Sequence, residues 1–398
     1  MHPSIPKLYE LAEKGSRLII GLMSGTSLDG LDIALCKVTG SGPSTQIELV
    51  QFQTVSYTNE FKDKLLAIFS KQNVSLEQLT LLNPWLAKQH AGMVNVAIAQ
   101  WGLKNDQIDL IASHGQTIYH APKSLHPNDE FGTATLQIGD GDHLAVATGI
   151  ITLSDFRQKH IAAGGDGAPL AVYGDYLVAV HPTENRLLLN IGGIANYTYL
   201  PANCSLSEVF STDTGPGNIM MDAFMRAHFM ESFDKNGEVA SSGVVNKNLL
   251  AVMESHSFFK LGMPKTIGPE LFNLAFIKTT QAQSNTVSIA EQDMMATLNN
   301  LTANSIVNAI QLKIPKDTNY TIYVSGGGLQ NIFLMENISK LVPNIKIKSS
   351  LDIGLQPDAK EAILFALLAN ECIAGDPMFA GGKSTKIPIS MGKISFPY

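Results

Sequence analysis

A glycine-rich run near the N-terminus carries the groups that bind phosphate. Residues 21–30, GLMSGTSLDG, combine glycines with hydroxyl side chains and a carboxylate. Small residues let backbone N–H groups converge on a phosphate without obstruction by Cβ atoms, and a carboxylate can hold hydrated Mg²⁺ beside it. A turn in which glycine only supplies a positive φ is the alternative. The residues that we expect to bind a nucleotide here are Gly21, Ser24, Gly25, Thr26, Ser27, Asp29 and Gly30, with Asp29 also near the metal.

Two more glycine turns follow strand-like runs. One is NIGG at 190–193, and the other is SGGG at 325–328, which opens onto a helix-like segment. The first run, at 21–30, is not a Walker A loop, because it lacks Gly-Lys-Ser/Thr and no helix follows it. It is not a dinucleotide fingerprint either, since a strand-like segment follows the turn. We expect Asn190, Gly192 and Gly193 to face the phosphates, and Gly326, Gly327, Gly328 and Asn331 to approach an adenosine.

An aspartate in the second half of the chain is the best candidate for a general base. Asp213 opens the run DTGPGN, after a strand-like stretch at 208–211. A carboxylate that is ionised at neutral pH can accept a proton during phosphoryl transfer. Gly215 and Asn218 of the same run are expected to contact the substrate, because Gly-Pro-Gly interrupts regular structure. The alternative is that Asp213 caps the helix that begins near residue 219 or is a turn aspartate before it.

A polar cluster follows a short apolar run at 108–112. This cluster, SHGQT at 113–117, is expected at the end of a strand, where α/β proteins commonly form their sites. We expect His114, Gln116 and Thr117 to hydrogen-bond a polar substrate such as a sugar. A purely structural role for His114 is equally open.

Strand-like and helix-like segments alternate along the whole chain, which indicates an α/β fold. The two turns at Gly25 and Gly192 each open a strand–turn–strand unit, which we interpret as a structural duplication. The expected lobes are residues 1–182 and 183–398, with the C-terminal helix at 358–374 free to pack back on the first lobe. A cleft between the lobes would hold the nucleotide.

The composition is that of a folded, soluble protein. Of the 398 residues, 45% are hydrophobic and 16% are charged, with a net charge of -7, so no basic face for nucleic acid is expected. Cys36, Cys204 and Cys372 are scattered and predict reduced core cysteines. The chain shows neither a secretory leader nor an apolar run of the about 20 residues that span a membrane, which predicts a cytoplasmic protein.

The run GLMSGTSLDGLDIAL at 21–35 resembles the N-terminal signature of the anhydro-N-acetylmuramic acid kinase family. The segments ASHGQTIYH, LSDFR, GAPL, LNIGGIANYTYL, DTGPGN, VSGGGLQN and DAKEA are similar to further family motifs, in order along nearly the whole chain. The resemblance implies a two-lobe actin/hexokinase-like (ribonuclease H-like) α/β fold, ATP and Mg²⁺ as cofactors, and a homodimer. It implies that 1,6-anhydro-N-acetylmuramic acid is opened and phosphorylated to N-acetylmuramic acid 6-phosphate in peptidoglycan recycling.

Two acidic positions take roles from this resemblance. Asp213 matches the catalytic base of the family. Glu361, in DAKEA, matches a position near the metal, which implies Mg²⁺ binding through water. For Glu361 the alternative is an interaction with the helix dipole. Asp358 is expected to be only a helix cap.

Other positions leave the identity of the substrate undecided. Asp155 and Arg157 follow a strand, and Arg157 can bind the lactyl carboxylate of a muramic acid or pair equally well with Asp155 or Asp166. Asp166 stands where the family usually has glutamine, and His160 where an acidic residue is common. The rival functions are therefore a kinase of the same fold acting on another sugar, or a non-catalytic nucleotide- or sugar-binding relative.

Overall fold

The computed structural model divides the chain into two compact units. It describes residues 2–123, 126, 128–167, 170–268, 271–315, 317–378 and 387–398. The first unit comprises Met1–Val180, Ser205–Glu208 and Asp358–Tyr398, and the second comprises His181–Cys204 and Val209–Pro357. The C-terminal segment from residue 358, which lay within the expected range of the second lobe, therefore belongs to the first unit.

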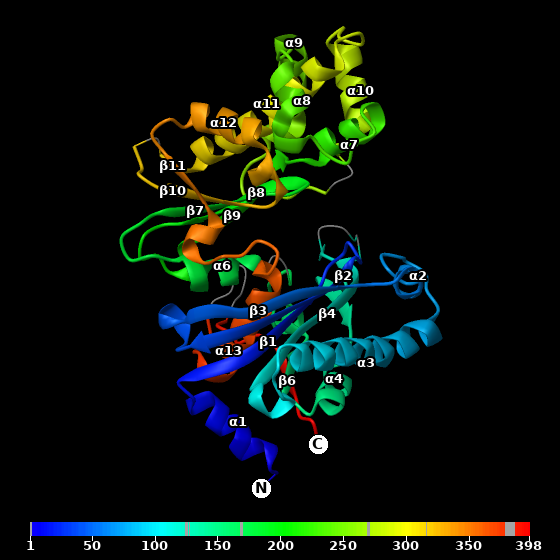
Figure 1. Ribbon diagram of the computed structural model, residues 1–398, viewed down its shortest axis with the longest axis vertical. Coiled ribbons are helices and arrows are strands. Elements are labelled where there is room, and N and C mark those ends of the chain that lie inside the picture. The colour runs from blue at the N-terminus through cyan, green and yellow to red at the C-terminus, as the bar shows by residue number, and fades with distance from the viewer. Residues whose placement is uncertain are drawn as a thin grey trace. The chain divides into compact units, whose positions relative to one another are not determined.

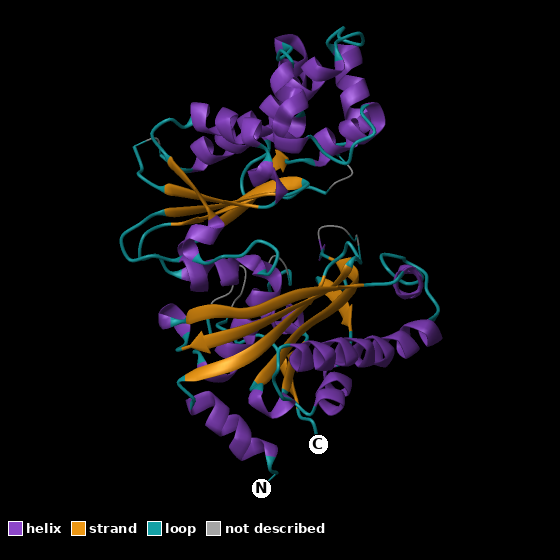
Figure 2. Cartoon of the chain, viewed as in Figure 1, coloured by secondary structure: helices purple, strands orange, loops and turns teal. Residues whose placement is uncertain are grey.

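The first unit is built on a seven-stranded sheet (Figure 2). Its strand order is β12-β6-β4-β1-β2-β3, with β5 beside β4. β1, β2 and β3 pair antiparallel, whereas β4 pairs parallel to both β1 and β6. The strands are β1 (Ser16–Ser24), β2 (Gly30–Thr39), β3 (Gln46–Ser56), β4 (Leu110–Ala121), β5 (Ala134–Ile138), β6 (Thr152–Ser154) and β12 (Lys393–Ser395).

Two long helices cover opposite faces of this sheet. Successive side chains of a strand point to opposite faces. Ile20 of β1 lies in a core shared with Leu86 of α3, whereas Gly21 lies against Ala362 of α13. Figure 1 shows α13, from the red end of the chain, beside the blue strands. The helices are α1 (Ser4–Glu13), α2 (Asn59–Leu66), α3 (Leu76–Gln100), α4 (Gly141–Thr148), α5 (Phe156–Ala162), α6 (Ala171–Ala179) and α13 (Lys360–Ala374).

The second unit repeats the strand order of the first. Its five-stranded sheet runs β11-β10-β7-β8-β9, with three antiparallel strands followed by two parallel ones. The strands are β7 (Arg186–Ile191), β8 (Ile194–Leu200), β9 (Phe210–Pro216), β10 (Thr321–Ser325) and β11 (Lys346–Ser349). The predicted duplication is therefore confirmed by topology, and the repeated order is that of the actin/hexokinase-like, ribonuclease H-like fold.

Helices of the second unit enclose its core. α11 is the most buried of them, and its residues Leu298, Leu301 and Ile306 share one core with Leu187 of β7 and Tyr197 of β8. The helices are α7 (Ile219–His228), α8 (Glu238–Ser242), α9 (Lys247–Glu254), α10 (Leu274–Gln283), α11 (Glu291–Lys313) and α12 (Ile332–Leu341). Throughout the described ranges, no helix combines the length and apolar character needed to cross a membrane.

Candidate active site

The first glycine turn joins β1 to β2, as predicted. Leu28 has a φ of 55°, its side chain is buried, and its N–H donates to the carbonyl of Gly25 over 3.2 Å. Ser27 Oγ donates to Asp29 Oδ1 over 2.7 Å. The buried leucine anchors the tip of the turn in the core, while Thr26, Ser27 and Asp29 are exposed and can reach a ligand.

Three of the residues expected to bind phosphate in this run have other roles. A Cβ on Gly21 would lie 1.9 Å from the Ala362 carbonyl oxygen, and one on Gly30 would lie 2.6 Å from that of Val55. Both glycines are therefore required by the close approach of neighbouring backbone. The Ser24 hydroxyl is buried and bonded to other side chains. The part of this turn that remains available to contact a ligand is therefore residues 25–29.

The remaining glycine motifs meet one another in the second unit. The N–H groups of Gly217 and Asn218 donate to the carbonyls of Gly193 and Gly192, each over 2.8 Å. A Cβ on Gly217 would lie 2.3 Å from the Gly192 oxygen, so only glycine fits there. Sequence reasoning missed this position. The run DTGPGN is thereby fastened to the turn between β7 and β8.

The third glycine turn packs against Ile191, at the end of β7. Gly326 has a φ of 83°, and a Cβ there would lie 2.7 Å from the Ile191 oxygen. Gly328 is equally tight against the Ile191 side chain, whereas a Cβ on Gly192, Gly193 or Gly327 would meet only ordinary contacts at 3.6 Å or more. Asn331 is the N-cap of α12, since its Oδ1 accepts from the N–H of Leu334 over 3.0 Å. Its side chain is thus committed to the helix, which was not expected.

Asp213 lies inside β9, and not after a strand as predicted. Pairing with β8 carries the strand through to Pro216, and a bulge in the register falls at Thr214. The N-cap of α7 is Asn218, so the alternative that Asp213 caps this helix is excluded. Bulges re-aim side chains and are common beside active sites.

The carboxyl group of Asp213 is half-buried and has one oxygen available. Oδ2 accepts from the N–H of Ile267 over 2.8 Å, and within the described ranges Oδ1 has no hydrogen-bond donor. Burial raises the pKa of Asp213, and the Ile267 N–H partly offsets this shift. A carboxylate with a free oxygen and a raised pKa is suited to accept a proton.

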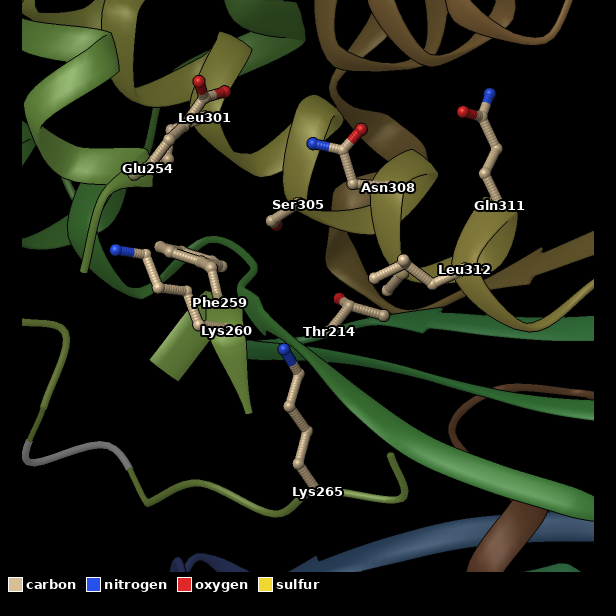
Figure 3. A pocket seen from close by; sticks show the side chains of 11 residues that line it. Thr214, Glu254, Phe259, Lys260, Lys265, Leu301, Ser305, Asn308, Gln311 and Leu312 are labelled. Carbon is tan, nitrogen blue, oxygen red and sulfur yellow. The ribbon is translucent and has the colours of Figure 1, made fainter. Parts of the chain in front are cut away.

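A pocket of about 490 Å³ adjoins Thr214 (Figure 3). It lies on the face of the sheet opposite to the Asp213 side chain. It is lined by α11, and the hydroxyl of Tyr197 reaches the Ala309 carbonyl of α11. Asp213 pairs with Asn196, the neighbour of Tyr197, and so faces away from α11. Gly215 packs against Phe259 on the α11 side, so its expected contact with substrate has a packing alternative.

The predicted sugar-binding cluster lies within β4. We expected residues 113–117 after a strand, but pairing with β5 extends β4 to Ala121. The parallel partners β1 and β6 nevertheless end beside residues 113–116. Gln116 is fully buried, which places its amide out of reach of a sugar, and Thr117 accepts from Gln137 over 3.0 Å.

His114 is buried and supports Arg157. Arg157 donates from Nε to His114 Nε2 over 2.9 Å and from a terminal nitrogen to the Gly167 carbonyl over 2.6 Å. Burial and the nearby Arg157 charge lower the pKa of His114 to about 3. The structural alternative for His114 is thus favoured. Neither alternative ion pair of Arg157 is found in the described part of the chain, because Asp155 pairs with Lys393 and Asp166 accepts from Thr133.

Carboxylates of the first unit influence one another through Asp32, a residue that sequence reasoning missed. Burial raises the pKa of Asp32, Thr54 opposes this shift, and Asp29 and Asp358 raise it further. Burial also raises the pKa of Glu361, with Arg157 opposing and Asp32 adding to the shift. Ala359, and not Asp358, is the N-cap of α13. In the part of the chain that is described, no three acidic, histidine or cysteine side chains are placed to ligate a metal directly.

His160, one of the two departures from the family pattern, is buried. His160 Nδ1 accepts from the N–H of Gly167 over 2.8 Å, and its ring lies under Gly165, where a Cβ would come within 2.4 Å. His160 is therefore a packing residue. Residues 168 and 169 of the GAPL motif lie outside the described residues.

The duplicated sheets, the glycine turns and the Asp213 carboxylate are the features expected of a sugar kinase of the actin/hexokinase-like class. The profile described as anhydro-N-acetylmuramic acid kinase matches residues 17–394. The chain belongs to the anhydro-N-acetylmuramic acid kinase family.

Curated relatives match over their whole length. The chain is 54% identical to the anhydro-N-acetylmuramic acid kinase of Pseudoalteromonas atlantica over 400 residues, which covers 100% of both chains. It is 40% identical to that of Caldanaerobacter subterraneus, with 98% and 99% of the two chains covered. Solved structures are more distant: an activator of 2-hydroxyisocaproyl-CoA dehydratase from Clostridium difficile aligns over 90% of this chain and 96% of its own, at 12% identity and a TM-score of 0.40.

Proposed function

We propose that this protein uses ATP to open and phosphorylate 1,6-anhydro-N-acetylmuramic acid, giving N-acetylmuramic acid 6-phosphate and ADP in peptidoglycan recycling. The observation that carries the proposal is the Asp213 carboxylate. Among the described residues none donates to its Oδ1, and it stands in the same run as the residues fastened to the β7–β8 glycine turn. Membership of the family supplies the substrate.

In the proposed reaction, the Asp213 carboxylate activates the water that opens the sugar ring, and phosphoryl transfer to the freed oxygen follows. Asp213 takes a proton from water, and the water oxygen attacks the anomeric carbon C1 of the sugar. The bond between C1 and the bridging oxygen O6 breaks, and O6 then attacks the γ-phosphorus of ATP. The bond from this phosphorus to the β–γ bridging oxygen breaks, so that ADP leaves. Water and the phosphoryl group are both incorporated into the product.

The nucleotide would be held by backbone more than by side chains. Gly25, Thr26 and Ser27 of the first turn and Gly192 and Gly193 of the second are proposed to bind the phosphates. The residues proposed at the adenosine are Gly326, Gly327 and Gly328. The support for this assignment is that Gly193 and Gly327 are exposed and Gly192 is half-exposed. Glycines in such positions let backbone N–H groups approach an anion.

Mg²⁺ would be held through water by Asp29 and Glu361, with Asp32 adding negative charge. Oxygen donors of this kind suit Mg²⁺, which keeps several of its waters. The electrostatics support the proposal, because the charge of Asp29 raises the pKa of Asp32 and that of Asp32 raises the pKa of Glu361. A divalent cation relieves like-charge repulsion of this kind. The cation would supply charge neutralisation on the phosphates.

Arg157 is the residue that we propose for the lactyl carboxylate of the sugar. His114 and Gly167 occupy two of its donors and fix the plane of its guanidinium group. A guanidinium group has five N–H donors, so others are left for a carboxylate. Thr117 and Asn218 are proposed as further sugar contacts. The use of ATP is consistent with the cytoplasmic location expected from the sequence, and the homodimer stays a prediction.

The composition of the product tests the proposed function. The protein is incubated with Mg²⁺, ATP and 1,6-anhydro-N-acetylmuramic acid in ¹⁸O-labelled water, and the product is analysed by mass spectrometry. We expect a sugar that has gained one phosphoryl group and one water, with the label at C1. A phosphorylated product without the added water, or equal turnover of glucose or N-acetylglucosamine, would instead support another sugar kinase.

A further inference from the structure

A line of four buried polar side chains ends beneath the first glycine turn. His90 Nε2 lies 2.8 Å from the hydroxyl oxygen of Tyr57, which lies 2.8 Å from Ser24 Oγ. Ser24 donates in turn to Gln116 Oε1, and Gln116 Nε2 donates to the carbonyl of Gly25 over 3.1 Å. We call these four residues the buried polar chain. None of them is more than 5% exposed.

The orientation of the Gln116 amide determines which group donates in each hydrogen bond of the buried polar chain. The Gln116 nitrogen must face the Gly25 carbonyl, so its oxygen faces Ser24, which must donate its only hydroxyl proton. Ser24 can then only accept from Tyr57, and Tyr57 can only accept from His90. His90 therefore carries its proton on Nε2. Burial lowers the pKa of His90 to about 3, in agreement with a neutral ring.

Tyr57 holds both sides of the turn at once. Its hydroxyl bonds Ser24, the last residue of β1, and its backbone N–H donates to the carbonyl of Asp29 over 2.9 Å, just before β2. Its ring stacks on Phe61 of α2, with the centroids 4.1 Å apart. The Gly25 carbonyl accepts from both Leu28 and Gln116. Residues 25–29 are therefore clamped between fixed points while their outward groups stay exposed.

We infer that Tyr57 and His90 are positioning residues that set the backbone of residues 25–29 for the phosphates of ATP. The inference rests on the proposed function, because it assumes that this turn binds the nucleotide. Tyr57 and His90 are buried, and their proposed action on the turn passes through Ser24, Gln116 and the Gly25 carbonyl. Their loss should therefore weaken ATP binding and leave sugar binding unchanged.

The substitution Tyr57→Phe tests this role, with Tyr197→Phe as its matched control. Both changes remove one buried hydroxyl and keep the ring, but Tyr197 bonds the Ala309 carbonyl in the core of the second unit. Leaving buried partners unsatisfied is costly, so we expect Tyr57→Phe to raise KM for ATP about tenfold. We expect KM for the anhydro sugar to stay within about twofold in both variants. Equal KM values for ATP in the two variants would overturn the inference.

Substitutions of His90 provide a rescue test. Glutamine can place an amide N–H near the position of Nε2, whereas leucine cannot donate. We expect His90→Leu to raise KM for ATP as Tyr57→Phe does. In His90→Gln, KM for ATP should return most of the way to the wild-type value. If both variants behave alike, the donated hydrogen bond is not what positions the turn.

Calorimetric titration with ADP separates this inference from the proposed function. If the wild-type protein binds ADP but does not turn over the anhydro sugar, the proposed function fails and the role of Tyr57 is still measured. We expect the Kd for ADP to rise in Tyr57→Phe and to stay unchanged in Tyr197→Phe. An unchanged Kd in Tyr57→Phe would contradict the inference whatever the sugar substrate proves to be.

Discussion

Arg157 donates from Nε to Nε2 of His114 over 2.9 Å, which leaves the ring proton of His114 on Nδ1, 2.9 Å from the Gly115 carbonyl. Arginine is always a donor, so this arrangement requires a neutral imidazole. His114 is thus unsuited to acid–base chemistry at neutral pH. It instead orients the guanidinium group that we propose for the substrate carboxylate.

Replacing Arg157 should change the titration of His114. The charge of Arg157 lowers the pKa of His114, so Arg157→Met should raise this pKa, while burial, the larger cause, keeps it below the usual 6.5. Histidine NMR spectra recorded against pH, assigned with His114→Gln, measure the change. We also expect KM for the sugar to rise about tenfold or more, since a charge-assisted bond is lost. Arg186→Met, in the second unit, is the control for activity; an unmoved His114 titration would contradict the account.

The pH dependence of turnover should report Asp213. Burial raises its pKa, so kcat/KM should fall on the acid side at a pH above the usual 3.8 and level off near neutrality, where the base is ionised. Asp222 in α7 is the competing source of such a limb, because burial raises its pKa to about 6. The limb should persist in Asp222→Asn. Its disappearance in that variant would assign the ionisation to Asp222.

The glycines of the first turn should respond differently to alanine. Gly21→Ala would drive a methyl group into the backbone of α13, so we expect the free energy of unfolding to fall by about 3 kcal/mol or more. Gly25→Ala meets only an ordinary contact with Ser27, 3.5 Å away, and should fold normally. Because its Cβ lies where phosphate would approach, Gly25→Ala should raise KM for ATP. Thermal unfolding and kinetics of both variants separate the two roles, and a normally stable Gly21→Ala would refute this packing argument.

Glu361→Gln tests the proposed magnesium site. Removing this charge should raise the Mg²⁺ concentration needed for half-maximal activity by about tenfold, as for other residues that act on a metal through water. Glu60→Gln, which breaks an exposed pair with Lys64, should leave that concentration unchanged. If Glu361→Gln instead needs no more Mg²⁺ than the wild type, Glu361 serves only the start of α13.

Local signals were sufficient to predict the duplicated hairpins. Gly25 and Gly192 stand between apolar runs, and a turn between two strands depends mainly on neighbouring residues. The ends of β4 and β9 were predicted wrongly, because pairing with β5 and β8 lengthens both strands. That pairing is tertiary and overrides the local pattern at Gly115 and Gly215.

The positioning residues left no signal in the sequence. Tyr57 and His90 act on Ser24 across loops, and Gln116 lies 92 positions beyond Ser24. Asp32 looks like an ordinary strand residue until Asp358 approaches it from the C-terminal segment. Such clusters exist only once the sheet and α13 are assembled.

The most direct test of the central claim is ADP formation with Mg²⁺, ATP and 1,6-anhydro-N-acetylmuramic acid by the wild-type protein and by Asp213→Asn. We predict that the wild type forms ADP only when the anhydro sugar is present. Asp213→Asn should bind ADP normally and lose activity by a factor of about 10²–10⁴, the usual contribution of a general base. Equal ADP formation with and without the sugar, or full activity in Asp213→Asn, would contradict the account.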